Sequence, residues 1–170
     1  STGTDSTALT SICLGTNGKK YLVRTKKIPD SHIEQPIIRF VQEEYNKYQT
    51  YYCVGEQEGG SASTYSSRYW EDMFKQYIPQ VLYTSERPIV SKFERSRPTA
   101  MEIINKDLYI VEDENTPELR EQIMYVHPDK KVMSERKSPD LLDSLNQGLY
   151  VLNSTCGIGM VGKGMFASKR

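Results

Sequence analysis

A chain of 170 residues with 37% hydrophobic and 26% charged side chains has the composition of a globular protein with one core. Its longest apolar runs are far too short to cross a bilayer, so we expect no membrane partner. The 22 basic and 22 acidic residues cancel, so net charge gives no argument for a nucleic-acid partner. Three cysteines without paired spacing indicate neither a disulfide framework nor a zinc site, and no secretion signal is visible. We therefore expect an intracellular protein.

The first half of the chain predicts the order strand, strand, helix, strand, helix, strand. Residues 7–14 and 20–25 are β-type runs on either side of Asn17-Gly18, a dipeptide typical of hairpin turns, so the two runs should pair antiparallel. A helical apolar period then continues to about residue 48. The next elements are expected at 50–55 (a buried strand), 62–77 (a helix) and 80–83 (a short strand). This alternation predicts an α/β fold.

The second half of the chain predicts three more helices and a strand. These elements are expected at 97–104 (helix), 107–111 (strand), 116–125 (helix) and 139–152 (helix). Residues 153–170 are rich in Gly, Ser and Lys, which predicts a loose or partner-bound tail. We therefore expect one domain over residues 1–152, followed by this tail.

The segment Ser138-Pro139-Asp140-Leu141-Leu142-Asp143 combines a helix start with two carboxylates. Ser138 can cap the helix and Pro139 suits its first position. Asp140 and Asp143 stand three residues apart, so both side chains project from one face near the first turn. Half of a metal site is one interpretation. The other is that acids are favoured in any first helical turn because they complement the helix dipole.

A second acidic position, Glu56, follows the buried strand at 50–55, where open α/β sheets place their ligands. Glu58 is an alternative, because strand alternation sends both side chains to the same side. A strand-end Glu and a helix-start Asp supply the carboxylate oxygens that hard divalent cations prefer. Two such ions can hydrolyse a phosphodiester. Asp5, just before the hairpin, is either a third acid of this site or an ordinary turn residue.

Three blocks, taken in order, resemble the nuclease domain of the large terminase subunits of tailed phages. They are Gly3-Thr4-Asp5-Ser6-Thr7-Ala8, Val54-Gly55-Glu56-Gln57-Glu58-Gly59-Gly60 and Ser138-Pro139-Asp140-Leu141-Leu142-Asp143-Ser144-Leu145. The segments 92–95, 108–110 and 117–122 resemble the stretches that those domains carry before the final acidic helix. The resemblance extends over nearly the whole chain, and its last block is the most specific.

The resemblance implies a ribonuclease H-like α/β fold, with a mixed central sheet, an antiparallel hairpin and helices on both faces. It implies an endonuclease that uses two Mg²⁺ or Mn²⁺ ions to cut concatemeric viral DNA during genome packaging. On the matching positions it implies Glu56 and Asp140 as metal ligands, Asp143 as a ligand or its neighbour, and Asp5 as an auxiliary acid. The family's principal first aspartate lies on a central strand before the position of Asp5, so we expect that acid upstream of Ser1.

Double-stranded DNA is the partner that this activity requires, and basic side chains are the candidates to contact its phosphates. The residues expected to face DNA are Lys92, Arg95 and Arg97, with Lys130, Lys131, Arg136 and Lys137 flanking the last helix. Solvated surface charge is the alternative for both groups. A terminase would also carry an ATPase domain in cis and would meet the small terminase subunit and the portal in the host cell cytoplasm.

Two other functions stay open at the level of the sequence. A resolvase- or integrase-type nuclease would share the acids and metals but differ in substrate. A catalytically silent DNA-binding or scaffold module would lack the complete set of acids. His32 and His127 are expected to be structural or exposed, because a two-metal nuclease needs no side-chain base.

Overall fold

The computed structural model of the protein describes residues 6–29, 32–56, 61–134, 136–155 and 164–169. Its elements in chain order are β1 (Ser6–Leu14), β2 (Lys20–Pro29), α1 (Glu34–Tyr48), β3 (Tyr52–Glu56), α2 (Ser61–Tyr77), β4 (Leu82–Glu86), α3 (Lys92–Ile104), β5 (Leu108–Ile110), α4 (Thr116–Tyr125), α5 (Lys130–Ser134), α6 (Asp140–Thr155) and β6 (Gly164–Lys169). The predicted α/β class is confirmed. None of the helices in these ranges is long and apolar enough to span a membrane.

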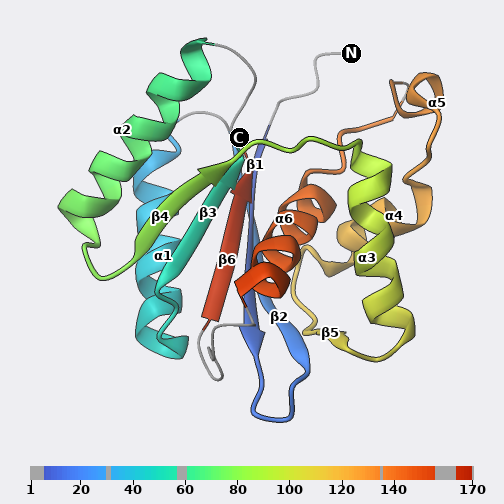
Figure 1. Ribbon diagram of the computed structural model, residues 1–170, viewed down its shortest axis with the longest axis horizontal. Helices are drawn as coiled ribbons and strands as arrows, with labels where there is room; N and C mark the ends of the chain where they lie inside the picture. Colours follow the sequence, from blue (N-terminus) through green and yellow to red (C-terminus); the bar gives the residue numbers. More distant parts are fainter. Residues whose placement is uncertain (1–5, 30–31, 57–60, 135, 156–163, 170) are drawn as a thin grey trace.

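Within these ranges the strands form one mixed sheet in the order β4-β3-β6-β1-β2-β5 (Figure 1). β1 pairs antiparallel with β2 on one side and with β6 on the other. β3 pairs parallel with both β4 and β6, and β2 pairs parallel with β5 at the opposite edge. The prediction of a mixed sheet that contains an antiparallel hairpin is therefore confirmed.

The hairpin between β1 and β2 turns where Asn17-Gly18 predicts it. Gly18 has φ +77°, a left-handed conformation that glycine adopts without steric cost. The Gly15 amide donates to the Lys19 carbonyl at 2.8 Å, and the Gly18 amide donates to the Gly15 carbonyl at 3.0 Å. Both strands are longer than the sequence pattern predicts. Their antiparallel pairing continues away from the turn as far as Ser6 and Pro29.

The C-terminal region differs from the prediction of a loose tail beginning at residue 153. α6 continues to Thr155, and residues 164–169 form β6, which is hydrogen-bonded on both sides in the middle of the sheet. The short run Gly-Met-Phe-Ala-Ser-Lys has little strand signal of its own. Its conformation comes from partners more than 100 residues away in sequence, which a local pattern cannot detect.

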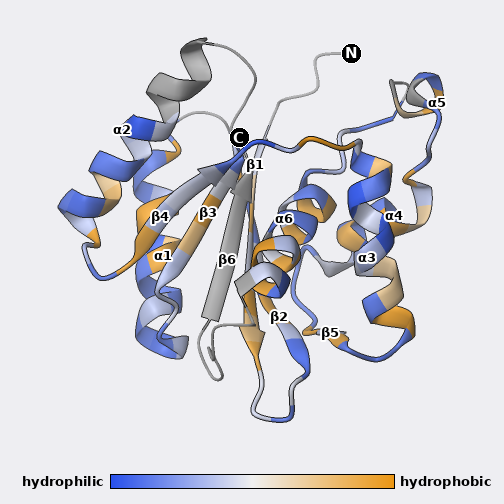
Figure 2. Ribbon diagram, in the orientation of Figure 1, coloured by the Kyte–Doolittle hydropathy of each residue, from blue (hydrophilic) through white to orange (hydrophobic). Residues whose placement is uncertain are grey.

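Helices cover both faces of the sheet, as predicted. Figure 1 shows α1 and α2 against one face and α6, with α3 and α4, against the other. Strand alternation divides the core in the same way: Leu9 and Cys53 pack with α1 and α2, whereas Ala8 and Val54 pack with α6. Figure 2 shows hydrophilic and hydrophobic residues alternating around α2 and α3, as expected for helices with one buried side.

The start of α3 is five residues earlier than the predicted helix at 97–104. The sequence pattern places the start next to Pro98, because proline is common in a first helical turn. In the structure Pro98 lies inside the helix, and Ser91 caps it by accepting a hydrogen bond from the Glu94 amide at 3.2 Å. The longer helix carries Lys92 and Arg95 in its first turn and therefore brings them to the end of the sheet described next.

Candidate functional site

Acidic residues from β3 and α6, which are remote in sequence, meet where several strands of the sheet begin or end. Glu56 is the last residue of β3, and the strand register places this end of β3 beside the end of β6 and the beginning of β1. The helix start at Asp140 lies over the same end of the sheet, because the Ser6 hydroxyl donates to Asp140 Oδ2 at 3.5 Å. Glu56 and Asp140, 84 positions apart in sequence, thus border one region.

Asp143 is the most deeply buried acid of this region, with a side chain that is 1% exposed. Lys92 Nζ lies 2.8 Å from Asp143 Oδ2 and donates a hydrogen bond of 2.9 Å to the Ser138 hydroxyl. The guanidinium of Arg95 lies 3.7 Å from Asp143 Oδ1 and 3.6 Å from Glu56 Oε2. Arg95 therefore bridges an acid at the end of β3 and an acid in the first turn of α6.

The bridge made by Arg95 is electrostatic, without tight hydrogen bonds. The side chains of Glu56 and Arg95 are 15% and 14% exposed, so both charges are largely removed from water. Within the described part of the chain, Glu56 Oε2 and Arg95 Nε are buried and make no hydrogen bond. Such desolvated charges attract strongly but leave hydrogen-bonding capacity unused.

Polar contacts fix the first turns of α6 on the sheet and on its neighbours. The amide of Leu142, which has no partner within its own helix, donates to Gln122 Oε1 of α4 at 2.9 Å. Ser144 shares a hydrogen bond of 3.0 Å with Thr10 of β1, and Thr99 of α3 donates to Asn146 at 2.5 Å. These contacts hold α6 from three sides, so the position of Asp143 is set by β1, α3 and α4 together.

Glu86 is an acidic neighbour that the sequence pattern missed. It ends β4, and the parallel register pairs it with Glu56, so both carboxylates project to the same face of the sheet. Burial raises the pKa of Glu86 above its ordinary value. The predicted strand at 80–83 stops before Glu86, so the signal that could have found it is the parallel pairing with β3.

The basic residues expected to face DNA have different surroundings. Lys92 and Arg95 point at the acids described above, whereas the exposed Arg97 lies 3.4 Å from Glu94 of its own helix. Lys131, Arg136 and Lys137 are exposed on the segment before α6, and the side chain of Lys130 lies outside the described residues. Their role in DNA binding stays a prediction.

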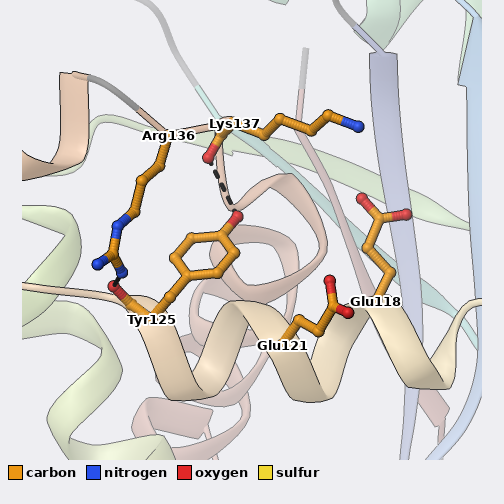
Figure 3. Close-up of a pocket in the computed structure, with 5 residues that line it drawn as sticks. All are labelled: Glu118, Glu121, Tyr125, Arg136 and Lys137. Atoms are coloured by element: carbon orange, nitrogen blue, oxygen red, sulfur yellow. Dashed lines mark hydrogen bonds between the residues drawn. The ribbon is translucent and has the colours of Figure 1, made fainter.

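A pocket of about 660 Å³ adjoins this basic segment (Figure 3). Its lining residues are Glu118, Glu121, Tyr125, Arg136 and Lys137. The Tyr125 hydroxyl donates to the Lys137 carbonyl at 3.1 Å, and the Arg136 guanidinium reaches the Tyr125 carbonyl and lies 5.4 Å from the centre of its ring. Burial, then the charges of Glu118 and Asp140, raise the pKa of Tyr125, so the pocket lies within electrostatic reach of Asp140.

The chemistry of the acids suits a hard divalent cation. Magnesium is usually held by one or two protein carboxylates and keeps several waters, and here Glu56 and Asp143 already converge on one cationic group. In the described ranges no three His, Cys, Asp or Glu side chains gather closely enough to hold a metal by themselves. Asp5 and Glu58, which the sequence offers as further acids, lie outside those ranges.

The strand between β1 and β3 brings no carboxylate to this end of the sheet. Residues 164–169 of β6 contain neither Asp nor Glu, and Lys169 is the residue in register with Ala8 of β1. His32 and His127 are exposed, as predicted.

No family model, curated protein or solved structure matches the chain.

Proposed function

We propose that the protein is a Mg²⁺- or Mn²⁺-dependent DNA endonuclease of the terminase large-subunit type, with a ribonuclease H-like fold. The observation that carries the proposal is the convergence of Glu56 and Asp143 on one guanidinium, with Asp140 beside the start of β1. Acids that are remote in sequence and partly desolvated at the ends of a strand and a helix are the arrangement that cation-assisted phosphodiester hydrolysis needs.

The residues of the chain have distinct roles in this proposal. Glu56, Asp140 and Asp143, with water molecules completing the coordination, would hold two metal ions, which would activate the attacking water and stabilise the leaving oxygen. The hydrogen bonds of Ser144 and Asn146 keep the turn that carries Asp143 in a fixed position on the sheet. The exposed Lys131, Arg136 and Lys137 would contact phosphates of the duplex without reading its sequence.

Cleavage of concatemeric viral DNA during packaging is the biological task that fits this activity. It would take place in the host cell cytoplasm, together with an ATPase domain in cis, the small terminase subunit and the portal. A resolvase-type substrate or a catalytically silent scaffold are the other readings, and the nicking assay below separates both from the proposal.

The test follows nicking of supercoiled plasmid as MnCl₂ is titrated, with the parent beside Glu56→Gln and Asp143→Asn. We expect nicking to depend on the metal. The nicking rate of both variants should fall by more than the roughly 10–100-fold that is typical when a hydrogen-bond partner of a metal ligand is mutated. Glu44→Gln is the matched control, because Glu44 is an equally buried acid on the opposite face of the sheet. It should keep the parent rate.

Four results would contradict the proposal. Nicking that persists in EDTA would separate cleavage from a divalent cation. Equal losses in Glu44→Gln and Asp143→Asn would show that only folding is being measured. A parent that binds DNA but never nicks it would favour the scaffold, and a strong preference for four-way junctions over plasmid would favour a resolvase.

A further inference from the structure

Among the residues that the structure describes, two arginines each contact two acids, and they do so in different ways. Arg24 of β2 lies 2.7 Å from Glu43 and 3.1 Å from Glu44, which are consecutive residues of α1. Arg95 of α3 lies between Glu56 and Asp143, which belong to two other elements. The first cluster joins a strand to one helix, whereas the second joins two helices and a strand end.

The distances separate the two clusters further. Both contacts of Arg24 are hydrogen bonds. The contacts of Arg95, at 3.6 and 3.7 Å, are longer than hydrogen bonds, and its Nε is buried with no hydrogen bond within the described part of the chain. A guanidinium normally binds a carboxylate through two short parallel bonds. Arg95 thus supplies charge to its acids without the geometry of a permanent structural pair.

Lys92 reinforces the same charge balance from the first turn of α3. Its ammonium nitrogen lies 2.8 Å from Asp143 Oδ2, and the Lys92 side chain is 37% exposed, so Lys92 stays in contact with solvent while it neutralises a buried acid. Together, Lys92 and Arg95 bring two positive charges to Glu56 and Asp143, which carry two negative ones. The acids are therefore neutralised from within the protein.

We propose that Arg95, assisted by Lys92, is an internal counter-ion that holds Glu56 and Asp143 together until a divalent cation takes its place between them. Metal binding at this site is then an exchange of one cation for another. The inference deepens the proposed function and rests on it in one respect only, namely that the cation is Mg²⁺ or Mn²⁺. Arg95 acts here as a positioning residue.

The exchange of Arg95 for a metal ion predicts that one substitution lowers stability and raises metal affinity. Removing the charge of Arg95 leaves two desolvated carboxylates near each other, which destabilises the metal-free protein and favours any cation that can replace the lost charge. A ligand that binds the folded state more tightly stabilises it more at a given concentration. Arg95→Gln should therefore lower metal-free stability and raise affinity for Mn²⁺ at the same time.

The experiment measures Mn²⁺ affinity by calorimetric titration and the melting temperature in EDTA and in MnCl₂. We expect Arg95→Gln to melt below the parent in EDTA, to bind Mn²⁺ at least about tenfold more tightly, and to recover most of the lost stability in MnCl₂. Arg24→Gln is the matched control, because it also removes the arginine from a pair of acids, of which Glu44 is buried and Glu43 is exposed. It should melt lower than the parent under both conditions and show the parent's Mn²⁺ affinity.

Removing an acid together with Arg95 tests whether the added Mn²⁺ affinity arises at this site. Glu56→Gln combined with Arg95→Gln removes one carboxylate together with its counter-ion, so the gain in Mn²⁺ affinity should disappear. If Arg95→Gln does not fold, Lys92→Gln is the second variant, because Lys92 is more exposed and its loss should raise Mn²⁺ affinity in the same direction by a smaller factor.

Unchanged or weaker Mn²⁺ binding in the folded Arg95→Gln or Lys92→Gln variant would overturn the inference, and so would an equal gain in Arg24→Gln. These outcomes are distinct from failure of the proposed nuclease. A parent that shows the exchange but never nicks DNA would refute the nuclease and keep the counter-ion. A parent that nicks with Mn²⁺ while Arg95→Gln binds it no better would refute the counter-ion and keep the nuclease.

Discussion

The two faces of the sheet are built from different kinds of buried side chain. Against α1 and α2 the core is apolar and aromatic, and its largest members are Phe40, Trp70 and Phe74. Against α6 the core is aliphatic and mostly leucine, yet the same helix also buries polar residues, which are Asp143, Ser144, Asn146 and Gln147. Apolar burial provides stability without direction, whereas buried polar groups require partners at defined positions.

The buried acids show what this difference means. Glu44, on the α1 face, accepts a hydrogen bond of 3.1 Å from Arg24, and the Arg24 guanidinium lies 4.7 Å from the centre of the Phe40 ring. Asp143, on the α6 face, has two basic neighbours and lies in a helix turn that is tied to several other elements. The first acid belongs to a closed structural cluster. The second belongs to a group whose charges can be rearranged, and that is the property a functional site needs.

Phe74→Ala gives the largest expected effect, because it opens a cavity in the apolar face. Phe74 is 1% exposed and contacts the rings of Trp70 and Tyr83. We expect a loss of about 3–5 kcal/mol in the free energy of unfolding, measured by urea denaturation. Because the acids lie across the sheet, the Mn²⁺ affinity of the folded variant should stay at the parent value. A large change in that affinity would show that the two faces are not independent.

The sequence could predict those parts of the fold that have a local cause. The hairpin follows from Asn17-Gly18, and the last helix follows from Ser138-Pro139 and its leucine pattern. The helical spacing of apolar residues also predicts α1 and α2, which precede and follow β3 in the chain. Each of these elements depends on residues within a few positions of one another, so a reading along the chain contains the needed information.

The parts that sequence reasoning missed depend on contacts between remote segments. β6 exists as a strand because β1 and β3 flank it, and its own sequence does not indicate that. The acids were found as separate candidates, but the place of Arg95 between Glu56 and Asp143 depends on α3 starting before Pro98. Two of the basic residues expected to face DNA, Lys92 and Arg95, lie beside the acids, and their contact with DNA stays a prediction. Tertiary packing, which no local pattern encodes, decided that outcome.

Gly55→Ala gives an intermediate effect and tests the boundary between the two faces. Gly55 is in β3 directly before Glu56, and a Cβ there would overlap the Tyr83 hydroxyl and lie 3.0 Å from Tyr83 Cζ. We expect a loss of about 1–3 kcal/mol in the free energy of unfolding, the usual cost of overpacking. Because the strand must shift next to Glu56, Mn²⁺ affinity should also weaken, unlike in Phe74→Ala.

A double-mutant cycle with Tyr83→Phe checks the cause of the Gly55→Ala effect. Removing the hydroxyl relieves the closest overlap, so the double variant should lose less stability than the sum of the two single variants. Additive losses would mean that the strand is disturbed for another reason. Unchanged Mn²⁺ affinity in Gly55→Ala would mean that β3 can move on the α1 side without moving Glu56.

Glu86→Gln gives the smallest expected effect, and its pH dependence carries the information. Because burial raises the pKa of Glu86 in the folded protein, the folded state favours the protonated carboxyl. The contribution of the protonated Glu86 carboxyl to folding stability is fully present below the pKa that Glu86 has in the unfolded protein, near 4.5. This contribution is lost as pH rises through the higher pKa that Glu86 has in the folded protein. The neutral amide should therefore make the protein more stable than the parent at pH 7, and the difference should vanish at pH 4 and below.

The comparison of unfolding free energies is made in EDTA, so that a divalent cation at Glu56 does not add its own charge. Asp72→Asn on α2 is the control, because Asp72 is an exposed acid on the other side of the sheet and its removal should change stability little at either pH. A Glu86→Gln variant that is less stable than the parent at pH 7 would mean that the charged carboxylate makes a favourable contact there. Glu86 would then belong with Glu56 and Asp143 to the group of acids that a cation holds, and the boundary of the site would extend to the edge strand β4.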